Sequence, residues 1–180
     1  IEKLCGVIIP KKTINELSKL LSETDQEIEI LISSTKIVFL INNLVLISKL
    51  IDGNFPDYKR VIPEENNNIL ELNRENLLSA VDRVSTVVNE KSPVMKLKLL
   101  KDQINLNTAN NDNSTATEDL NAHYNGDEFE IGFNSKYIMD IINNLEDEII
   151  SINFKDSSSP IIAQEKSNPN LVYVLMPMRV

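Results

Sequence analysis

Three stretches of the chain share one pattern of apolar and polar positions. Each begins with a short apolar run, continues with apolar residues three and four positions apart, and ends in runs that alternate every second residue. The first spacing predicts a helix with one apolar face, and the alternation predicts strands with one buried face. When Pro10, Leu72 and Phe133 are aligned at the expected strand–helix junctions, the copies lie 62 and 61 residues apart. The chain therefore contains three copies of one structural unit.

The three predicted helices each have a single apolar stripe, which must pack against a flat apolar surface. Pro10 suits the first turn of a helix, and Asn73 and Asn134 suit N-caps. The stripes consist of Ile14, Leu17, Leu20 and Leu21; of Leu77, Val81, Val84 and Val88; and of Ile138, Ile141, Ile142 and Leu145.

Three strand-like runs follow each helix, with turn residues between them. Each unit is thus a strand, a helix and three strands. This order predicts an α+β fold of antiparallel sheets with helices on one face, in which two units share a core with their helices side by side. The runs are 27–33, 36–42 and 44–51; 94–100, 103–109 and 117–124; and 148–154, 160–166 and 171–178.

Composition places the chain among ordinary globular proteins. Of its 180 residues, 42% are hydrophobic and 25% are charged. No apolar run approaches the ~20 residues that cross a membrane, and no signal peptide is visible. The one cysteine fits a reducing compartment, so we expect a cytoplasmic protein. The chain begins with Ile1, which suggests a natural start further upstream.

The residues that most enzymes need are scarce. His123 is the only histidine and lies in an alternating run, so we expect a plain strand residue there. One Cys and one His cannot form a tetrahedral zinc site, and four glycines form no phosphate-binding loop. Asp127, Glu128 and Glu130 lie close together in "GDEFE", which a solvated turn explains more simply than acid–base catalysis. We therefore predict no catalytic activity, no metal and no cofactor.

The segment "IDGNFPDYKRVIP", residues 51–63, has more aromatic and basic residues than a flexible linker needs. Phe55 and Tyr58 are expected to pack it against the flanking domains. With the terminal "YVLMPMRV" and with "FEIGFNSKYIMDII" and "VIIPKKTINELSKLL", it resembles the bacterial sliding clamp, the beta subunit of DNA polymerase III. The resemblance covers essentially the whole chain.

Such a resemblance implies a ring of two head-to-tail subunits around duplex DNA, with sheets outside and helices lining the hole. Each subunit would have three similar domains. Residues 1–50 would be the second half of the middle domain, 51–63 the linker, and 64–180 the complete C-terminal domain. The first domain and the front of the middle domain are absent, so this chain is expected to be a monomer or to make a non-native contact.

The family's hydrophobic cleft captures short peptides from the replicative polymerase, the clamp loader and repair polymerases. Matching motifs assign cleft residues in the linker, at one helix start and in the tail. Ser158 and Pro160 depart from the family's pattern, which leaves their role open. The assigned residues are Pro56, Arg60, Val61, Asn134, Tyr137, Val174, Leu175, Met176, Pro177, Met178, Arg179 and Val180.

A net charge of −9 argues against a general nucleic-acid binder, but a basic inner surface is compatible with it. The bases on the polar faces of the helices could contact phosphate or could be ordinary solvated residues, and the acids are expected mainly in loops and strands. The candidate DNA-facing residues are Lys11, Lys12, Lys19, Arg74, Arg83 and Lys136. The resemblance also assigns the subunit interface to Thr86, Val87 and Val88.

A second class of function stays open at this point. A stand-alone peptide-binding module without a role on DNA would share the cleft but would not need basic helix faces. Retention of the full-length protein on circular DNA, and its sensitivity to salt, would separate the two.

Overall fold

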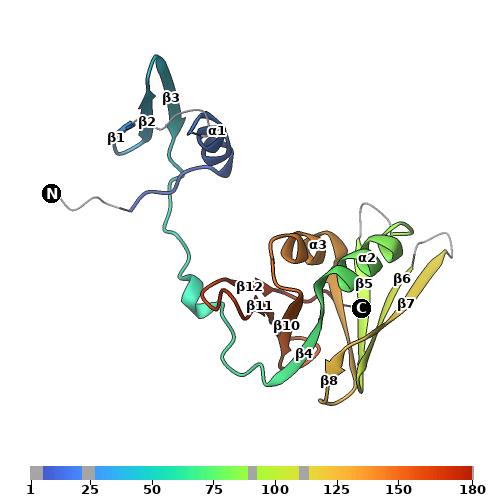
Figure 1. The fold of residues 1–180 in the computed structure, drawn as a ribbon. Coiled ribbons are helices and arrows are strands. Elements are labelled where there is room, and N and C mark those ends of the chain that lie inside the picture. Colours follow the sequence, from blue (N-terminus) through green and yellow to red (C-terminus); the bar gives the residue numbers. More distant parts are fainter. Residues whose placement is uncertain (1–5, 22–26, 89–92, 110–113, 180) are drawn as a thin grey trace. The chain divides into compact units, whose positions relative to one another are not determined.

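The computed structural model describes residues 6–21, 27–88, 93–109 and 114–179. The chain divides into two compact units, Ile1–Asp57 and Tyr58–Val180 (Figure 1), which we describe separately. Their construction confirms the predicted α+β fold of antiparallel sheets, helices and repeated strand–helix–three-strand units. In the described residues, no helix has the length and apolar character required to cross a membrane.

The first unit contains one copy of the repeat, except that its expected first strand is only an isolated bridge between Ile8 and Ile51. Its strands form an antiparallel sheet in the order β1-β2-β3, and the core centres on Ile37, Phe39 and Ile41 of β2. Its elements are α1 (Lys11–Leu21), β1 (Glu29–Ile32), β2 (Lys36–Ile41) and β3 (Leu44–Lys49).

The contacts of α1 differ from the prediction in two ways. The helix begins at Lys11, and the Pro10 carbonyl accepts a hydrogen bond from the Thr13 N–H at 2.9 Å, so Pro10 precedes the first turn. Ile14 is 42% exposed, whereas Thr13 is buried with its hydroxyl 2.7 Å from that of Ser48 in β3. The helix is therefore rotated so that a satisfied hydroxyl, rather than Ile14, faces the sheet.

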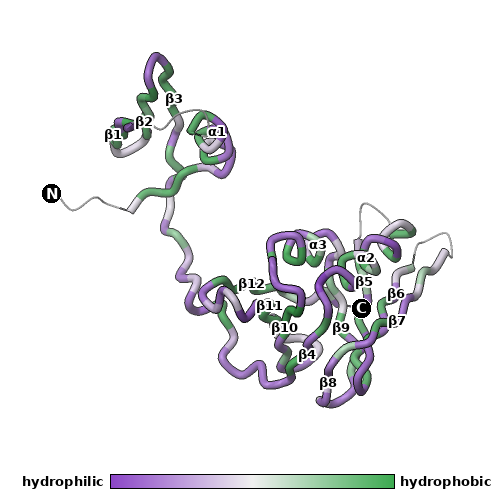
Figure 2. Tube along the Cα trace, in the orientation of Figure 1, coloured by the Kyte–Doolittle hydropathy of each residue, from purple (hydrophilic) through white to green (hydrophobic). Residues whose placement is uncertain are grey.

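The second unit contains the other two copies of the repeat. A short 3-10 helix, η1 (Tyr58–Arg60), precedes a connection that is mostly polar (Figure 2). The remaining elements are β4 (Asn68–Asn73), α2 (Arg74–Ser85), β5 (Val94–Leu100), β6 (Gln103–Ala109), β7 (Thr115–Asn121), β8 (His123–Tyr124), β9 (Phe129–Asn134), α3 (Ser135–Asn143), β10 (Ile149–Phe154), β11 (Ile161–Glu165) and β12 (Val172–Leu175).

The two repeats of this unit exchange their first strands. Strand β4 pairs with β10 in the sheet β12-β11-β10-β4-β8, and β9 pairs with β5 in the sheet β7-β6-β5-β9. Helix α2 packs against α3, and one core receives side chains from both helices and both sheets. Each repeat therefore depends on the other for a complete sheet.

Local details agree with the predicted helix starts but not with every predicted strand. Asn73 and Asn134 are N-caps, as predicted, and their side chains accept the N–H groups of Asn76 and Lys136. The run 117–124 was expected to be one strand, but the structure divides it at Ala122. The N–H of Ala122 donates to the carbonyl of Asp102 at 3.1 Å, and the chain passes from one sheet to the other there.

The sheet β12-β11-β10-β4-β8 contains one fully buried aromatic residue in β8. Tyr124 is fully buried, and its hydroxyl donates to the carbonyl of Asp127 at 2.8 Å. Burial raises the pKa of this phenol above its ordinary value. A Cβ at Gly126 would lie 2.5 Å from the Tyr124 oxygen, so only glycine fits beneath it.

Candidate functional site

The C-terminal tail crosses from one sheet of the second unit to the other. Strand β12 ends at Leu175, and the Met178 N–H then donates to the carbonyl of Gly132 in β9 at 2.8 Å. Gly132 lies two residues before the N-cap of α3. One backbone bridge thus holds the tail beside the start of α3, where sequence reasoning placed Asn134 and Tyr137.

The tail offers an apolar surface with a cation at its end. Met176, Tyr137 and Arg179 are exposed, whereas Pro177 and Met178 are half-buried. Since methionine is flexible and polarisable, such a surface can adapt to different apolar side chains. Two rigid elements, β9 and β12, position it.

The other four assigned residues of this group are buried, half-buried or outside the described residues. Leu175 is 8% exposed and belongs to the hydrophobic core, so its assignment to an exposed cleft is corrected. Asn134 is half-buried, and its side-chain oxygen caps α3 through a 3.0 Å bond from the Lys136 N–H. Val174 is half-buried in β12, and Val180 lies outside the described residues.

The linker residues Arg60 and Val61 lie near the start of the second unit and are exposed. Arg60 lines a pocket of about 370 Å³ together with Lys59, Ser159 and Pro160. Sequence reasoning left the role of Pro160 open and treated Ser159 only as turn material. The side-chain amide of Asn66 explains how the pocket wall is held, since it donates to the carbonyls of Asn153 and Pro160, both at 2.9 Å.

Charged groups support the same pocket wall. Lys155 donates to the Glu65 carboxylate at 2.5 Å, which lowers the pKa of Glu65 and raises that of Lys155. The carboxylate of Asp156 accepts hydrogen bonds from the backbone and hydroxyl groups of Ser158 and Ser159, which lowers its pKa to about 2. The Asp156 carboxylate and the serine hydroxyl groups therefore stabilise one conformation of the loop after β10.

The aromatic residues of the linker, Phe55 and Tyr58, are exposed within their own units. The prediction that they pack the linker against the flanking domains stays a prediction. Pro56, the remaining linker residue assigned to the cleft, is exposed and belongs to the first unit.

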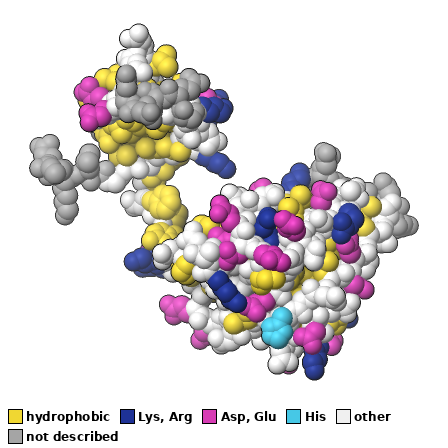
Figure 3. Space-filling view, viewed as in Figure 1, with side chains coloured by type: hydrophobic (Ala, Val, Ile, Leu, Met, Phe, Trp, Pro, Cys, Tyr) yellow, Lys and Arg dark blue, Asp and Glu magenta, His cyan; other side chains and the backbone are white. Residues whose placement is uncertain are grey.

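The predicted DNA-facing bases are mostly exposed, but they share their helices with acids. Lys11, Lys12 and Lys19 on α1 and Lys136 on α3 are exposed, and Lys19 lies 3.1 Å from Glu16. The helices of the second unit also expose three acidic residues, and Figure 3 shows acids and bases interspersed on one face of that unit. Most acidic residues lie in loops and strands, as predicted, but the described helices also contain a few. The three in the second unit are Glu75, Asp82 and Asp140.

The two arginines of α2 already have protein partners. Arg83 binds Glu118 of β7 through two nitrogens, with Nε 3.0 Å from Oε2. The pair lowers the pKa of Glu118 and raises that of Arg83. The guanidinium of Arg74 is mostly covered and lies 3.5 Å from Glu75. Neither is an isolated surface cation.

The residues assigned to the subunit interface follow α2 directly. The helix ends at Ser85, and the Thr86 hydroxyl donates to the Arg83 carbonyl at 2.8 Å, so Thr86 is the C-cap. Val87 and Val88 are half-buried in the turn that follows. Helix α2 packs on β7, which is the end strand of its sheet among the described residues.

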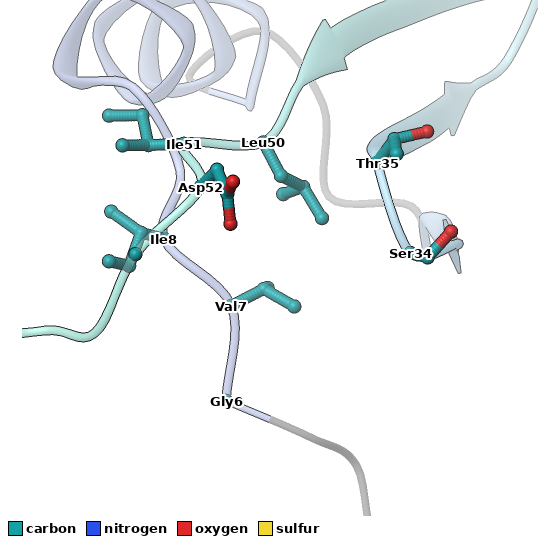
Figure 4. Close-up of a pocket in the computed structure, with 9 residues that line it drawn as sticks. Gly6, Val7, Ile8, Ser34, Thr35, Leu50, Ile51 and Asp52 are labelled. Atoms are coloured by element: carbon teal, nitrogen blue, oxygen red, sulfur yellow. The ribbon is translucent and has the colours of Figure 1, made fainter.

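The first unit has a pocket of its own that no motif predicted. It has a volume of about 370 Å³, and in Figure 4 Val7 and Leu50 extend toward the side on which Ser34 and Thr35 lie. Asp52 is the one ionisable residue in its lining. Across the residues that the structure describes, no group of three or more His, Cys, Asp and Glu side chains could hold a metal ion.

Comparison with protein families gives two matches in chain order. Residues 2–57 match the central domain of the DNA polymerase III beta subunit, and residues 59–179 match its C-terminal domain. Curated relatives named beta sliding clamp share 39% identity over 97% of this chain in Caulobacter vibrioides and 36% in Haemophilus influenzae. The chain spans about half the length of these relatives, 47% and 48% respectively.

Solved structures agree with the sequence matches. A sliding clamp from Bartonella birtlesii bound to griselimycin has a TM-score of 0.88 and 43% identity, covering 98% of this chain and 48% of that one. The Caulobacter crescentus pol III beta structure has a TM-score of 0.89 and 38% identity, again covering 98% of this chain and 48% of its own.

Proposed function

The chain belongs to the DNA polymerase III beta subunit family, and from this premise we propose that it is the C-terminal part of a sliding clamp. The clamp would encircle duplex DNA as a head-to-tail homodimer and act as the processivity factor of the replicative polymerase. It would be a non-catalytic, cytoplasmic protein without a cofactor. Residues 1–50 would complete the middle domain, 51–63 would form the linker, and 64–180 would form the last domain.

Peptide capture at the tail is the part of this function that the described residues support best. The observation that carries it is the 2.8 Å bridge from Met178 to Gly132, which fixes an apolar tail beside the start of α3. Apolar side chains of a peptide would lie against Met176 and Tyr137. Arg179 could bind peptide carbonyls or carboxylates, since a guanidinium provides five donors. Partners would be the polymerase, the clamp loader and repair polymerases.

A binding measurement on this chain tests the proposal. We would titrate the chain into a fluorescein-labelled peptide with leucine and phenylalanine anchors and follow anisotropy. Met176→Ala and Arg179→Ala should each weaken binding about tenfold, which corresponds to ~1.4 kcal/mol. Val172→Ala, at an exposed position of β12 away from the tail, is the matched control and should bind like the parent chain. Equal affinities for all four proteins would remove the tail from the site.

Contact with DNA would be weak and independent of sequence. A ring that slides needs phosphate attraction at its hole without tight contacts to bases. Lys11, Lys12 and Lys136 are the exposed cations that suit this role, whereas Arg83 would first have to leave Glu118. The alternative of a peptide-binding module without DNA predicts that the full-length protein is not retained on circular DNA at low salt.

A further inference from the structure

The chain has four methionines, and their surroundings differ widely. Met95 in β5 is 1% exposed, and Met139 in α3 is half-buried against the core of the second unit. Met178 in the tail is also half-buried, and its backbone is held against β9 by the bond to Gly132. Met176 is 61% exposed. It is therefore the methionine that a small solute reaches most readily.

The exposure of Met176 follows from how the tail is anchored in the second unit. Leu175, the residue before it, is 8% exposed and belongs to the core, and two residues later the Met178 N–H donates to the Gly132 carbonyl at 2.8 Å. Pro177, between Met176 and Met178, has a fixed φ and no N–H. These anchors hold the backbone of Met176 at the surface. A site there that admits a peptide also admits hydrogen peroxide, which is far smaller.

Hydrogen peroxide oxidises a thioether by direct oxygen transfer. A lone pair of the sulfur attacks one peroxide oxygen, and the O–O bond breaks. The proton on the transferred oxygen passes to the departing hydroxide, which leaves as water. Sulfur gives up an electron pair and the peroxide accepts it, so the step needs no metal or cofactor. The product, methionine sulfoxide, is polar, and thiol-dependent reductases convert it back to methionine.

We propose that Met176 is a reversible oxidation site through which peroxide weakens peptide capture at the tail. This inference rests on the proposed function, which assigns Met176 to the surface that apolar peptide side chains cover. Such a side chain would remove the sulfoxide oxygen from water without offering it a donor, which is unfavourable. We therefore expect the sulfoxide form to bind peptide about tenfold more weakly. Since Met176 is not part of the buried core, the fold should remain intact.

Peroxide treatment of the whole chain tests both the oxidation and its effect. Peptide mapping by mass spectrometry should find oxygen on Met176 before Met178 and Met139, and on Met95 last. The anisotropy titration described above then measures peptide affinity, after catalase has removed the peroxide and with a labelled peptide made without methionine or cysteine. Affinity should fall about tenfold as the Met176 sulfoxide accumulates, and methionine sulfoxide reductase with dithiothreitol should restore it.

Two variants separate Met176 from the other residues that peroxide can oxidise. Met176→Leu keeps an apolar side chain of similar volume without the sulfur, so peroxide should change its affinity by less than about twofold. Met178→Leu is the matched control, which retains Met176 and should lose as much affinity as the parent chain. Each protein is compared with itself before and after peroxide, so a different starting affinity does not affect the result. Cys5 is present in all three proteins and cannot explain a difference between them.

Three results would overturn the proposal: oxidation of Met178 ahead of Met176, an unchanged affinity of the oxidised parent chain, or an equal loss of affinity in Met176→Leu. A parent chain that binds no peptide before peroxide is added would refute the proposed function and this inference with it. Binding that persists through complete oxidation of Met176 would leave peptide capture standing and refute only the oxidation switch.

Discussion

A buried carboxylate in β11 holds the turn that follows α3, and its removal should be costly. Glu165 is 5% exposed, and its Oε2 accepts the N–H groups of Glu146 at 2.6 Å and of Asp147 at 3.0 Å. The turn joins α3 to β10, so the carboxylate fixes both elements at the centre of the second unit. The side chain of Asp147 in turn accepts a hydrogen bond from the Ser167 N–H at 2.9 Å.

The magnitude follows from these two bonds. A hydrogen bond to a charged group contributes about 1.5–3 kcal/mol, and a buried N–H left without an acceptor loses its solvation as well. Because water can partly replace the carboxylate, we expect Glu165→Ala to destabilise the second unit by about 3 kcal/mol. For a unit of this size, with an unfolding entropy of about 2.1 cal/mol/K per residue, that is a loss of about 12 °C in Tm.

Differential scanning calorimetry of the full chain would measure this loss in the transition of the second unit. Glu165→Gln keeps a hydrogen-bond acceptor without the charge. It should therefore destabilise the second unit by about half as much as Glu165→Ala. Glu128→Ala, which removes an exposed carboxylate near β9, is the control and should change stability by less than about 0.5 kcal/mol. A loss in Glu165→Ala no larger than that of the control would refute the role given to these two bonds.

Three further predictions concern a glycine, an aspartate and the charge of the helices. Gly126→Ala should destabilise the second unit by about 1–3 kcal/mol in urea unfolding, because its Cβ would crowd the buried Tyr124 hydroxyl, whereas Gly6→Ala, with no neighbour within 4 Å, should be neutral. The Asp156 carboxyl should titrate near pH 2 by NMR; its stabilising effect is complete above the ordinary pKa of 3.8 and is lost as the pH falls toward 2. A midpoint near 3.8 would contradict the serine contacts. Short linear duplex should not bind the chain measurably by anisotropy at physiological salt, since the net charge is −9, and saturable micromolar binding would contradict this.

Periodicity predicted the repeats well because most of the strands and helices have one buried face. It could not predict the rotation of α1, since Thr13 and Ile14 are adjacent and the choice depends on Ser48, 35 residues away. It also missed the break at Ala122, because alternation continues through that residue while the backbone bonds to Asp102. Counting bases alone suggested a basic surface on all three helices, although acids on α2 and α3 balance the bases there and only α1 keeps an excess of lysines.

The motif resemblance identified the tail residues, but it could not predict how they are arranged. A hydrogen bond from Met178 to Gly132 joins residues 46 positions apart, and no local pattern predicts it. Leu175 shows the opposite problem, since a motif includes it with exposed neighbours although strand alternation turns it into the core. Motif and alternation together would have separated Leu175 from Met176.

The exchange of first strands links the stability of the second unit to its proposed site. Strand β9, which receives the tail, is held by β5 of the other repeat, while β12, which delivers the tail, is held by β11. The tail therefore has its observed position only when both sheets are assembled. A peptide that binds there would recognise the assembled unit and not the unfolded chain, so binding must stabilise the unit by an amount that grows with peptide concentration. Peptide binding and the folding of both repeats are thus thermodynamically coupled, as expected for a site on two sheets that neither repeat can complete alone.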